Sequence, residues 1–213
     1  MTFWSATLTV LLYVWDALKE WLYIFISPME NLEILWIIIP IWINWFFSEW
    51  FQEKKGTSFG NAISNGAVPL YIGIDWTRHL TRLVTAGTLE FSLMLVLKYL
   101  LCVVAILYGF SIIFFGIRAK KFIHFYGRIR ETTYVMVVFS PVIYGIINLS
   151  WKFLLLIIIF FPVYYYFIEL LAKYTPDPRI YKFDKGKKEE LETPALGEEV
   201  PGLSEPLDKN IKF

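Results

Sequence analysis

The sequence predicts an all-α protein: a polytopic bundle of transmembrane helices with five full spans, one broken or re-entrant segment and an amphipathic surface helix. Composition is the first observation behind this fold class. Hydrophobic residues make up 57% of the 213 residues and charged residues only 18%, whereas ordinary soluble domains carry about 45–50% and about 25%. The second observation is that long apolar stretches recur along the chain, and about 20 such residues suffice to cross a bilayer.

The first predicted span, residues 3–26, carries charges in its second half. Asp16, Lys19 and Glu20 would each cost roughly 2.5–3.5 kcal/mol at the centre of a lipid-facing helix. At 3.6 residues per turn, however, these three side chains share one stripe of the helix. The segment therefore either crosses the membrane with this stripe turned inward or lies flat at the interface, and we favour the crossing.

The second predicted span, residues 32–51, follows a helix stop at Ser27-Pro28, because proline cannot continue the hydrogen-bond ladder. It is strongly apolar and rich in tryptophan, as expected near a membrane surface. Pro40 lies inside this span and should kink it. Glu49 comes late in the span and is one of the ionisable residues expected inside the membrane.

Residues 58–74 combine small residues with Asn61 and Asn65, which are four positions apart. Two interpretations remain open. Small residues at this spacing let two helices pack closely, and asparagine can hydrogen-bond between helices. Alternatively, Pro69 and Gly73 break the segment into a re-entrant or discontinuous helix that lines an ion or solute site.

A surface helix is predicted over residues 76–85, with Asp75 as its N-terminal cap. Its apolar residues share one face, and Arg78, His79 and Arg82 lie on the other. This pattern is typical of a short amphipathic helix that lies at the membrane surface.

Three further spans are predicted over residues 89–117, 133–149 and 151–171. Lys98 is embedded in the first of them. The last two are joined by a tight turn near Ser150, so we expect them to form an antiparallel hairpin.

The chain is predicted to divide into a membrane bundle, residues 1–173, and a polar, largely disordered tail, residues 174–213. The basic loop, residues 118–131, is expected on the cytoplasmic side, and the hairpin returns the tail to that side. If residues 58–74 cross fully, Lys54 and Lys55 also lie inside and the N-terminus is cytoplasmic. If that segment only dips into the membrane, the N-terminus lies outside.

Known catalytic patterns are missing from the sequence. There is no glycine-rich phosphate loop, no nucleophile-elbow serine and no helix with paired histidines. Cys102 is the single cysteine, which excludes a disulfide framework. We therefore predict no catalytic residue, no cofactor and no metal, and the net charge of +1 gives no reason to expect a nucleic-acid partner.

The candidate site residues are polar groups expected at membrane depth, where ionisable side chains commonly mark ion routes or interhelical pairs. They are Asp16, Lys19, Glu20, Glu49, Asn61, Asn65, Asp75 and Lys98. Lys98 has no acidic residue three or four positions away in its own helix. We therefore hypothesise that it pairs with Asp16, Glu20 or Glu49, with extension of Lys98 to the lipid headgroups as the alternative.

A dense, motif-like run covers residues 49–78, with the sequence EWFQEKKGTSFGNAISNGAVPLYIGIDWTR. Together with the surrounding architecture, this run resembles small polytopic membrane proteins of archaeal type. The resemblance implies a membrane helix bundle and carries over no catalytic residue.

The leading functional hypothesis is a non-enzymatic integral membrane protein that acts as a structural protein or as a subunit of a membrane complex. Its expected partners are the lipid bilayer and a protein, or a second copy, bound through the transmembrane helices. The alternative is a small transporter or ion channel that uses residues 61–75 and Lys98. A membrane-embedded lipid-modifying enzyme is the third hypothesis.

Overall fold

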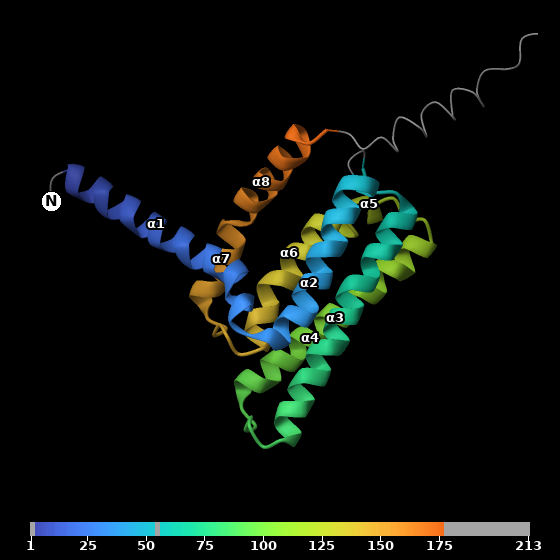
Figure 1. The fold of residues 1–213 in the computed structure, drawn as a ribbon, viewed down its shortest axis with the longest axis horizontal. Coiled ribbons are helices and arrows are strands. Elements are labelled where there is room, and N and C mark those ends of the chain that lie inside the picture. The colour runs from blue at the N-terminus through green and yellow to red at the C-terminus, as the bar shows by residue number, and fades with distance from the viewer. Residues whose placement is uncertain (1–2, 54–55, 177–213) are drawn as a thin grey trace, which may run out of the picture. The chain divides into compact units, whose positions relative to one another are not determined.

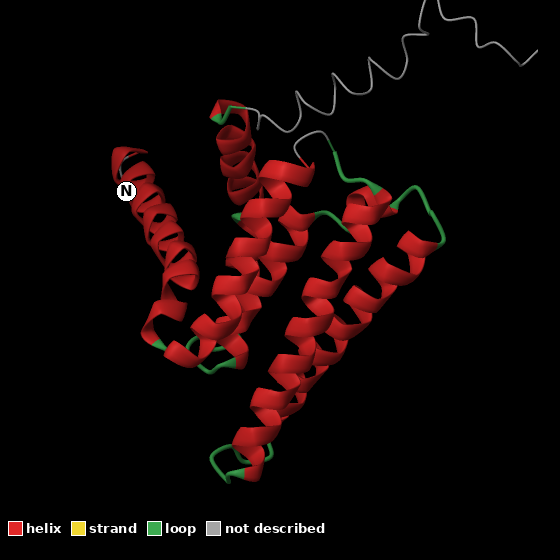
Figure 2. Ribbon diagram, turned by 45° about the vertical axis from the view of Figure 1, so that its right-hand side comes forward, coloured by secondary structure: helices red, strands yellow, loops and turns green. Residues whose placement is uncertain are grey.

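The computed structural model describes residues 3–53 and 56–176. Within them every regular element is a helix (Figures 1 and 2). The elements are α1 (Phe3–Ile26), η1 (Ser27–Glu30), α2 (Leu32–Phe47), η2 (Ser48–Glu53), α3 (Phe59–Thr85), α4 (Leu93–Ile117), α5 (Ile123–Tyr126), α6 (Ile129–Ile143), α7 (Trp151–Ile159) and α8 (Phe161–Tyr174). Lys54, Lys55 and nearly all of the predicted tail, from residue 177 onward, lie outside the described residues.

Within the described residues, three segments are long and apolar enough to cross a membrane: Leu32–Gln52, Leu93–Ile117 and Trp151–Tyr174. The all-helical fold is thus confirmed, but the prediction of five full spans is not. α1 is not one of these candidate spans, because any stretch of it long enough to cross a membrane contains Asp16, Lys19 and Glu20. At 15 residues, α6 is about 22 Å long, shorter than the roughly 30 Å hydrocarbon core.

The first two helices begin and end where local chemistry predicts. Pro28 starts the 3₁₀ turn η1 after α1. The side chain of Asn31 then caps α2 by accepting a hydrogen bond from the Glu33 backbone N–H at 2.9 Å. Pro40 lies inside α2 as expected, and the helix continues past it into the π-helical turn η2.

The polar stripe of α1 does not turn inward. Asp16 and Lys19 pair with each other at 2.8 Å and have side chains that are 65% and 56% exposed. Only the last part of α1 packs on the bundle, through the buried side chains of Trp21 and Ile24. Ala17 and Leu18 also pack there, whereas the two charged side chains face away from the bundle, so the inward-facing prediction is wrong for Asp16 and Lys19.

α3 is one continuous helix of 27 residues, and this corrects three predictions. Residues 58–74 are neither broken nor re-entrant, residues 76–85 are not a separate surface helix, and Asp75 is not an N-terminal cap. Ser58 caps the helix instead, by accepting from the backbone N–H of Asn61 at 3.1 Å. Tertiary packing overrides the local stop signals, because the apolar face of the last turns is buried in the bundle. Trp76, for example, is buried and donates from Nε1 to Ser140 Oγ at 3.2 Å.

Glycines let α3 and α4 pack at very short range, side by side in Figures 1 and 2. A Cβ atom at Gly109 would lie 2.6 Å from the Gly66 carbonyl oxygen and 2.6 Å from the Leu70 backbone nitrogen. A Cβ atom at Gly73 would lie 3.0 Å from the Cys102 carbonyl oxygen. The close-packing interpretation of residues 58–74 is therefore confirmed.

α6 is the central helix, with 11 of its 15 residues buried. It begins and ends earlier than the predicted segment, residues 133–149. Gly145 follows it with a φ of +76°, and the Ile146 backbone N–H donates back to the Pro141 carbonyl at 2.9 Å. Glycine tolerates this left-handed conformation, so it ends the helix there.

The last predicted span, residues 151–171, is divided into α7 and α8. Pro162 lies in the first turn of α8, which accounts for the break. The Tyr134 hydroxyl donates to the Ile157 carbonyl at 2.6 Å, and Arg128 Nη1 donates to the Tyr165 hydroxyl at 3.1 Å. Residue numbers rise on one helix as they fall on the other, so these helices run antiparallel to α6, as predicted.

Two ends of the bundle are useful reference points. At the cavity end, α2 begins, α3 ends, α4 begins and α6 ends, near Leu32, Thr85, Leu93 and Ile143 (Figure 1). At the loop end, α2 ends, α3 begins, α4 ends and α6 begins.

Candidate functional site

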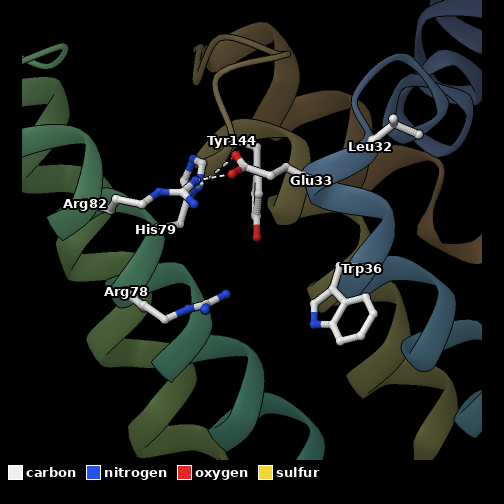
Figure 3. Close-up of a pocket in the computed structure, with 7 residues that line it drawn as sticks. All are labelled: Leu32, Glu33, Trp36, Arg78, His79, Arg82 and Tyr144. Carbon is white, nitrogen blue, oxygen red and sulfur yellow. Dashed lines mark hydrogen bonds and ion pairs between the residues drawn. The ribbon is translucent and has the colours of Figure 1, made fainter. Parts of the chain in front are cut away.

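A cavity of about 360 Å³ lies between the start of α2 and the last turns of α3. Its wall combines charged, aromatic and apolar side chains from three parts of the chain. The lining residues are Leu32, Glu33, Trp36, Arg78, His79, Arg82 and Tyr144. Figure 3 shows Arg82 and His79 beside the Glu33 carboxylate, while Arg78 extends toward the space between Tyr144 and Trp36.

The helix ends bring these side chains together. Asp75 lies three residues before Arg78 and four before His79, and Arg82 lies four and three residues after them, so α3 presents all four on one face. Glu33 lies in the first turn of α2, and Tyr144 directly follows α6. The site therefore forms where the N-terminal end of α2 meets the C-terminal ends of α3 and α6.

Glu33 is the acceptor that joins α2 to α3. Its carboxylate forms an ion pair with Arg82, and its Oε2 lies 3.6 Å from Nδ1 of His79. The His79 ring stacks on Tyr144 with the ring centroids 3.9 Å apart. Its Nε2 is buried without a hydrogen-bond partner among the described residues.

Asp75 lies behind the cavity and is only 5% exposed. Its Oδ1 accepts from Arg78 Nη2 at 2.6 Å, and its Oδ2 accepts from the Tyr144 hydroxyl at 2.8 Å. Burial raises the pKa of Tyr144, and the hydrogen bond to Asp75 raises it further. Tyr144 therefore stays protonated and acts as a fixed donor to the carboxylate.

Lys98 is the third cation in this region. It is half-buried, and its Nζ lies 3.5 Å from the carbonyl oxygen of Ile143. No carboxylate of the described residues forms an ion pair with it, so the predicted pairing with Asp16, Glu20 or Glu49 is wrong. Those carboxylates pair elsewhere, and Glu49 lies at the opposite end of the bundle.

His79 should make folding stability depend on pH. Burial lowers the pKa of His79 below its usual value of 6.5, Glu33 and Asp75 oppose the shift, and Arg82 and Lys98 add to it. The unfolded chain then binds the proton more readily than the folded chain, so stability falls as the pH drops below about 6.5.

We therefore expect the unfolding temperature in maltoside micelles to fall between about pH 7.5 and about pH 5.5. The His79→Gln variant should lose most of this slope, because it removes the titrating ring. An identical slope in the variant would contradict this assignment.

A second ion cluster, at the loop end, ties η2, α6 and α8 together. Glu49 is only 3% exposed. Arg130 donates to it from Nη2 at 2.5 Å and from Nε at 2.8 Å, and from Nη1 to Glu169 at 2.5 Å. Glu49 therefore serves as an anchor between helices.

The remaining predicted residues also make structural contacts. Asn65 Nδ2 donates to the Gly127 carbonyl at 2.9 Å, and Asn61 Nδ2 donates to the Gln52 carbonyl at 3.0 Å. Glu20 accepts from Lys152 at 2.5 Å. Of the predicted set, only Asp75 and Lys98 belong to the surroundings of the cavity.

Most of the cavity wall is not predictable from the sequence. The sequence predicts Arg78, His79 and Arg82 on the polar face of a surface helix, and their spacing does place them on one face together. Glu33 and Tyr144 gave no local signal, because they join the site only through tertiary contacts. Arg130 was missed for the same reason.

The site offers cations, two carboxylates and an aromatic wall, which suit binding of a charged group. No cluster of three or more histidine, cysteine or acidic residues that could hold a metal ion occurs within residues 3–53 and 56–176. Comparisons with protein-family models, curated proteins and solved structures find no match. The resemblance of residues 49–78 to archaeal-type membrane proteins therefore stays a prediction.

Proposed function

We propose that the protein is a multi-pass integral membrane protein with a non-enzymatic role, acting as a structural protein or as a subunit of a membrane complex. The observation that carries this proposal is how the polar groups of the helices are used. Glu49, Asn65 and Glu20 each join segments distant in sequence, through Arg130, the Gly127 carbonyl and Lys152. Such contacts stabilise one arrangement of helices.

The outward surfaces of the candidate spans support membrane insertion. On α4, the exposed large side chains of Leu100, Val104, Leu107 and Phe110 repeat every three or four residues. They form one apolar stripe on the side of α4 that faces away from α3. Exposed apolar surface of this extent is typical of contact with lipid or with another protein.

The arrangement of charges supports an orientation in which the connection between α4 and α6 lies on the cytoplasmic side. Arg118, Lys120, Lys121 and Arg128 lie in the connection between α4 and α6, at the loop end. The contact of Arg130 with Glu169 places the last turns of α8 at this same end. Basic loops favour the cytoplasmic side, so we place this loop and the chain after α8 there.

The subunit role is supported by α1. Leu11, Tyr13 and Trp15 are exposed, and the exposed Asp16–Lys19 pair lies next to them near the middle of the helix. If α1 crosses the membrane, this pair faces lipid near the middle of the helix, where charges are costly. Cover by a protein, either another subunit or a second copy, would remove that cost.

Photo-crosslinking from α1 tests the subunit role. A photoreactive phenylalanine analogue at Val14 in native membranes should give a discrete protein adduct of higher mass. The same analogue at Leu107, on the apolar stripe of α4, serves as the matched lipid-facing control and should give none. If neither position gave a crosslinked adduct and the protein kept its own mass in both samples, the subunit role would be contradicted.

A second candidate function, transport of an ion or small solute, is favoured by the cavity and the buried Asp75 behind it. Access to Asp75 passes Tyr144, which donates to it. This function predicts proton or potassium flux in liposomes that the Asp75→Asn variant changes and the exposed Asp16→Asn variant does not. If the unmodified protein and both variants gave only the flux of protein-free liposomes, this transport route would be excluded.

A further inference from the structure

We propose that the cavity between α2 and α3 binds a phosphate group, with the guanidinium groups of Arg78 and Arg82 as its main ligands. The phosphate can belong to a phospholipid headgroup or be free inorganic phosphate. Both sources offer the same chemistry, and the experiment below separates them.

The charge balance of the region favours an anion. Three cations (Arg78, Arg82 and Lys98) are opposed by two carboxylates (Glu33 and Asp75). Each arginine already neutralises one carboxylate, which leaves the positive charge of Lys98 without a counter-ion among the described residues. A bound phosphate would supply the missing negative charge next to these groups.

The two arginines keep donors for a ligand. Within the described residues, Arg78 and Arg82 each form their ion pair through Nη2 alone. A guanidinium has five N–H donors, and its planar fork matches the oxygens of phosphate. Their side chains are 72% and 57% exposed and lie one turn apart on the same face, so one phosphate can reach both.

The remaining wall keeps the ion pairs in place. His79 is only 6% exposed, and its ring stacks on Tyr144, which donates to Asp75. Glu33 would repel a phosphate if it were unpaired, but Arg82 neutralises it.

The position of the cavity favours a lipid as the source of the phosphate. Two candidate spans begin at this end, with Leu32 and Leu93, so the site is level with a membrane boundary. Leu32 and Trp36 are strongly exposed beside the arginines. Arginines next to exposed apolar side chains at this level match a headgroup phosphate followed by acyl chains.

The test uses the purified full chain in maltoside micelles, which contain no phosphate. Native mass spectrometry compares retention of dioleoyl phosphatidic acid with that of dioleoylglycerol, which has the same chains and no phosphate. Thermal unfolding with and without inorganic phosphate measures the second source. The variant Arg78→Gln/Arg82→Gln is compared with Arg118→Gln/Lys120→Gln, which removes the same charge at the loop end.

If the site binds lipid, the protein should retain more phosphatidic acid than dioleoylglycerol. This preference should fall by about tenfold in Arg78→Gln/Arg82→Gln and stay unchanged in the control variant. A free-phosphate site predicts saturable stabilisation by inorganic phosphate that the same variant abolishes, with no preference between the lipids. Loss of Arg78 leaves the buried Asp75 without its cation, whereas loss of Arg82 affects the half-exposed Glu33, so Arg82→Gln alone serves as the milder variant and should weaken binding severalfold. Binding of neither source, or equal loss in the control, overturns the proposal.

Discussion

Replacing Arg130 with methionine is expected to lower the free energy of unfolding by about 3–5 kcal/mol, because it leaves a buried carboxylate without its counter-ion. Glu49 is almost fully buried and receives two nitrogens of Arg130. The same guanidinium holds Glu169, and it lies 5.3 Å from the Tyr165 ring centroid. One substitution therefore loosens η2, α6 and α8 together.

Two further variants separate charge burial from loss of packing. In Glu49→Gln/Arg130→Met no buried carboxylate is left unpaired, and the Glu169 carboxylate is exposed, so most of the lost stability should return. Lys19→Met breaks the exposed pair with Asp16, and exposed pairs contribute only about 0–1 kcal/mol. Chemical unfolding in micelles measures all three. Equal losses from Arg130→Met and Lys19→Met would show that Glu49 is not buried as described.

Replacing Gly109 with alanine is expected to destabilise the protein by about 3 kcal/mol through overpacking. In most helix interiors this change is stabilising by about 1 kcal/mol, because alanine is the better helix former. Here the new Cβ atom would lie 2.6 Å from backbone atoms of Gly66 and Leu70. Backbone atoms cannot turn aside, so α3 and α4 must separate.

Gly60→Ala is the matched control, because Gly60 is also a helical glycine but its Cβ atom would meet nothing closer than Ser58 Oγ at 3.9 Å. We expect this variant to be neutral or slightly stabilising in the same unfolding measurement. If Gly109→Ala were as mild as Gly60→Ala, the close approach of α3 to α4 would be wrong.

Local chemistry determined several features of this protein. Ser27-Pro28 ended α1, and the apolar content of residues 32–51 predicted a membrane-length helix. The small residues of residues 58–74 predicted close packing between helices, which Gly66 provides. Signals of this kind act within one or two turns, so they can be found in the chain itself.

Other features depended on partners far away in the sequence. Asp75 looked like a helix cap, but α3 runs through it because its last turns are buried in the bundle, and the Asp75 carboxylate instead accepts from Tyr144, 69 residues later. Lys98 gave no indication that its contact would be the Ile143 carbonyl.

The sequence by itself determined the helical class, the apolar segments and most helix stops, because these follow from propensity, capping and periodicity over a few residues. Only the tertiary structure decided that α3 is continuous, that α6 is central and that Glu33 meets His79 and Arg82. Such contacts join residues about 50 positions apart, and no local pattern encodes them. The cavity is made of these long-range contacts, so it could be found only once the helices were assembled.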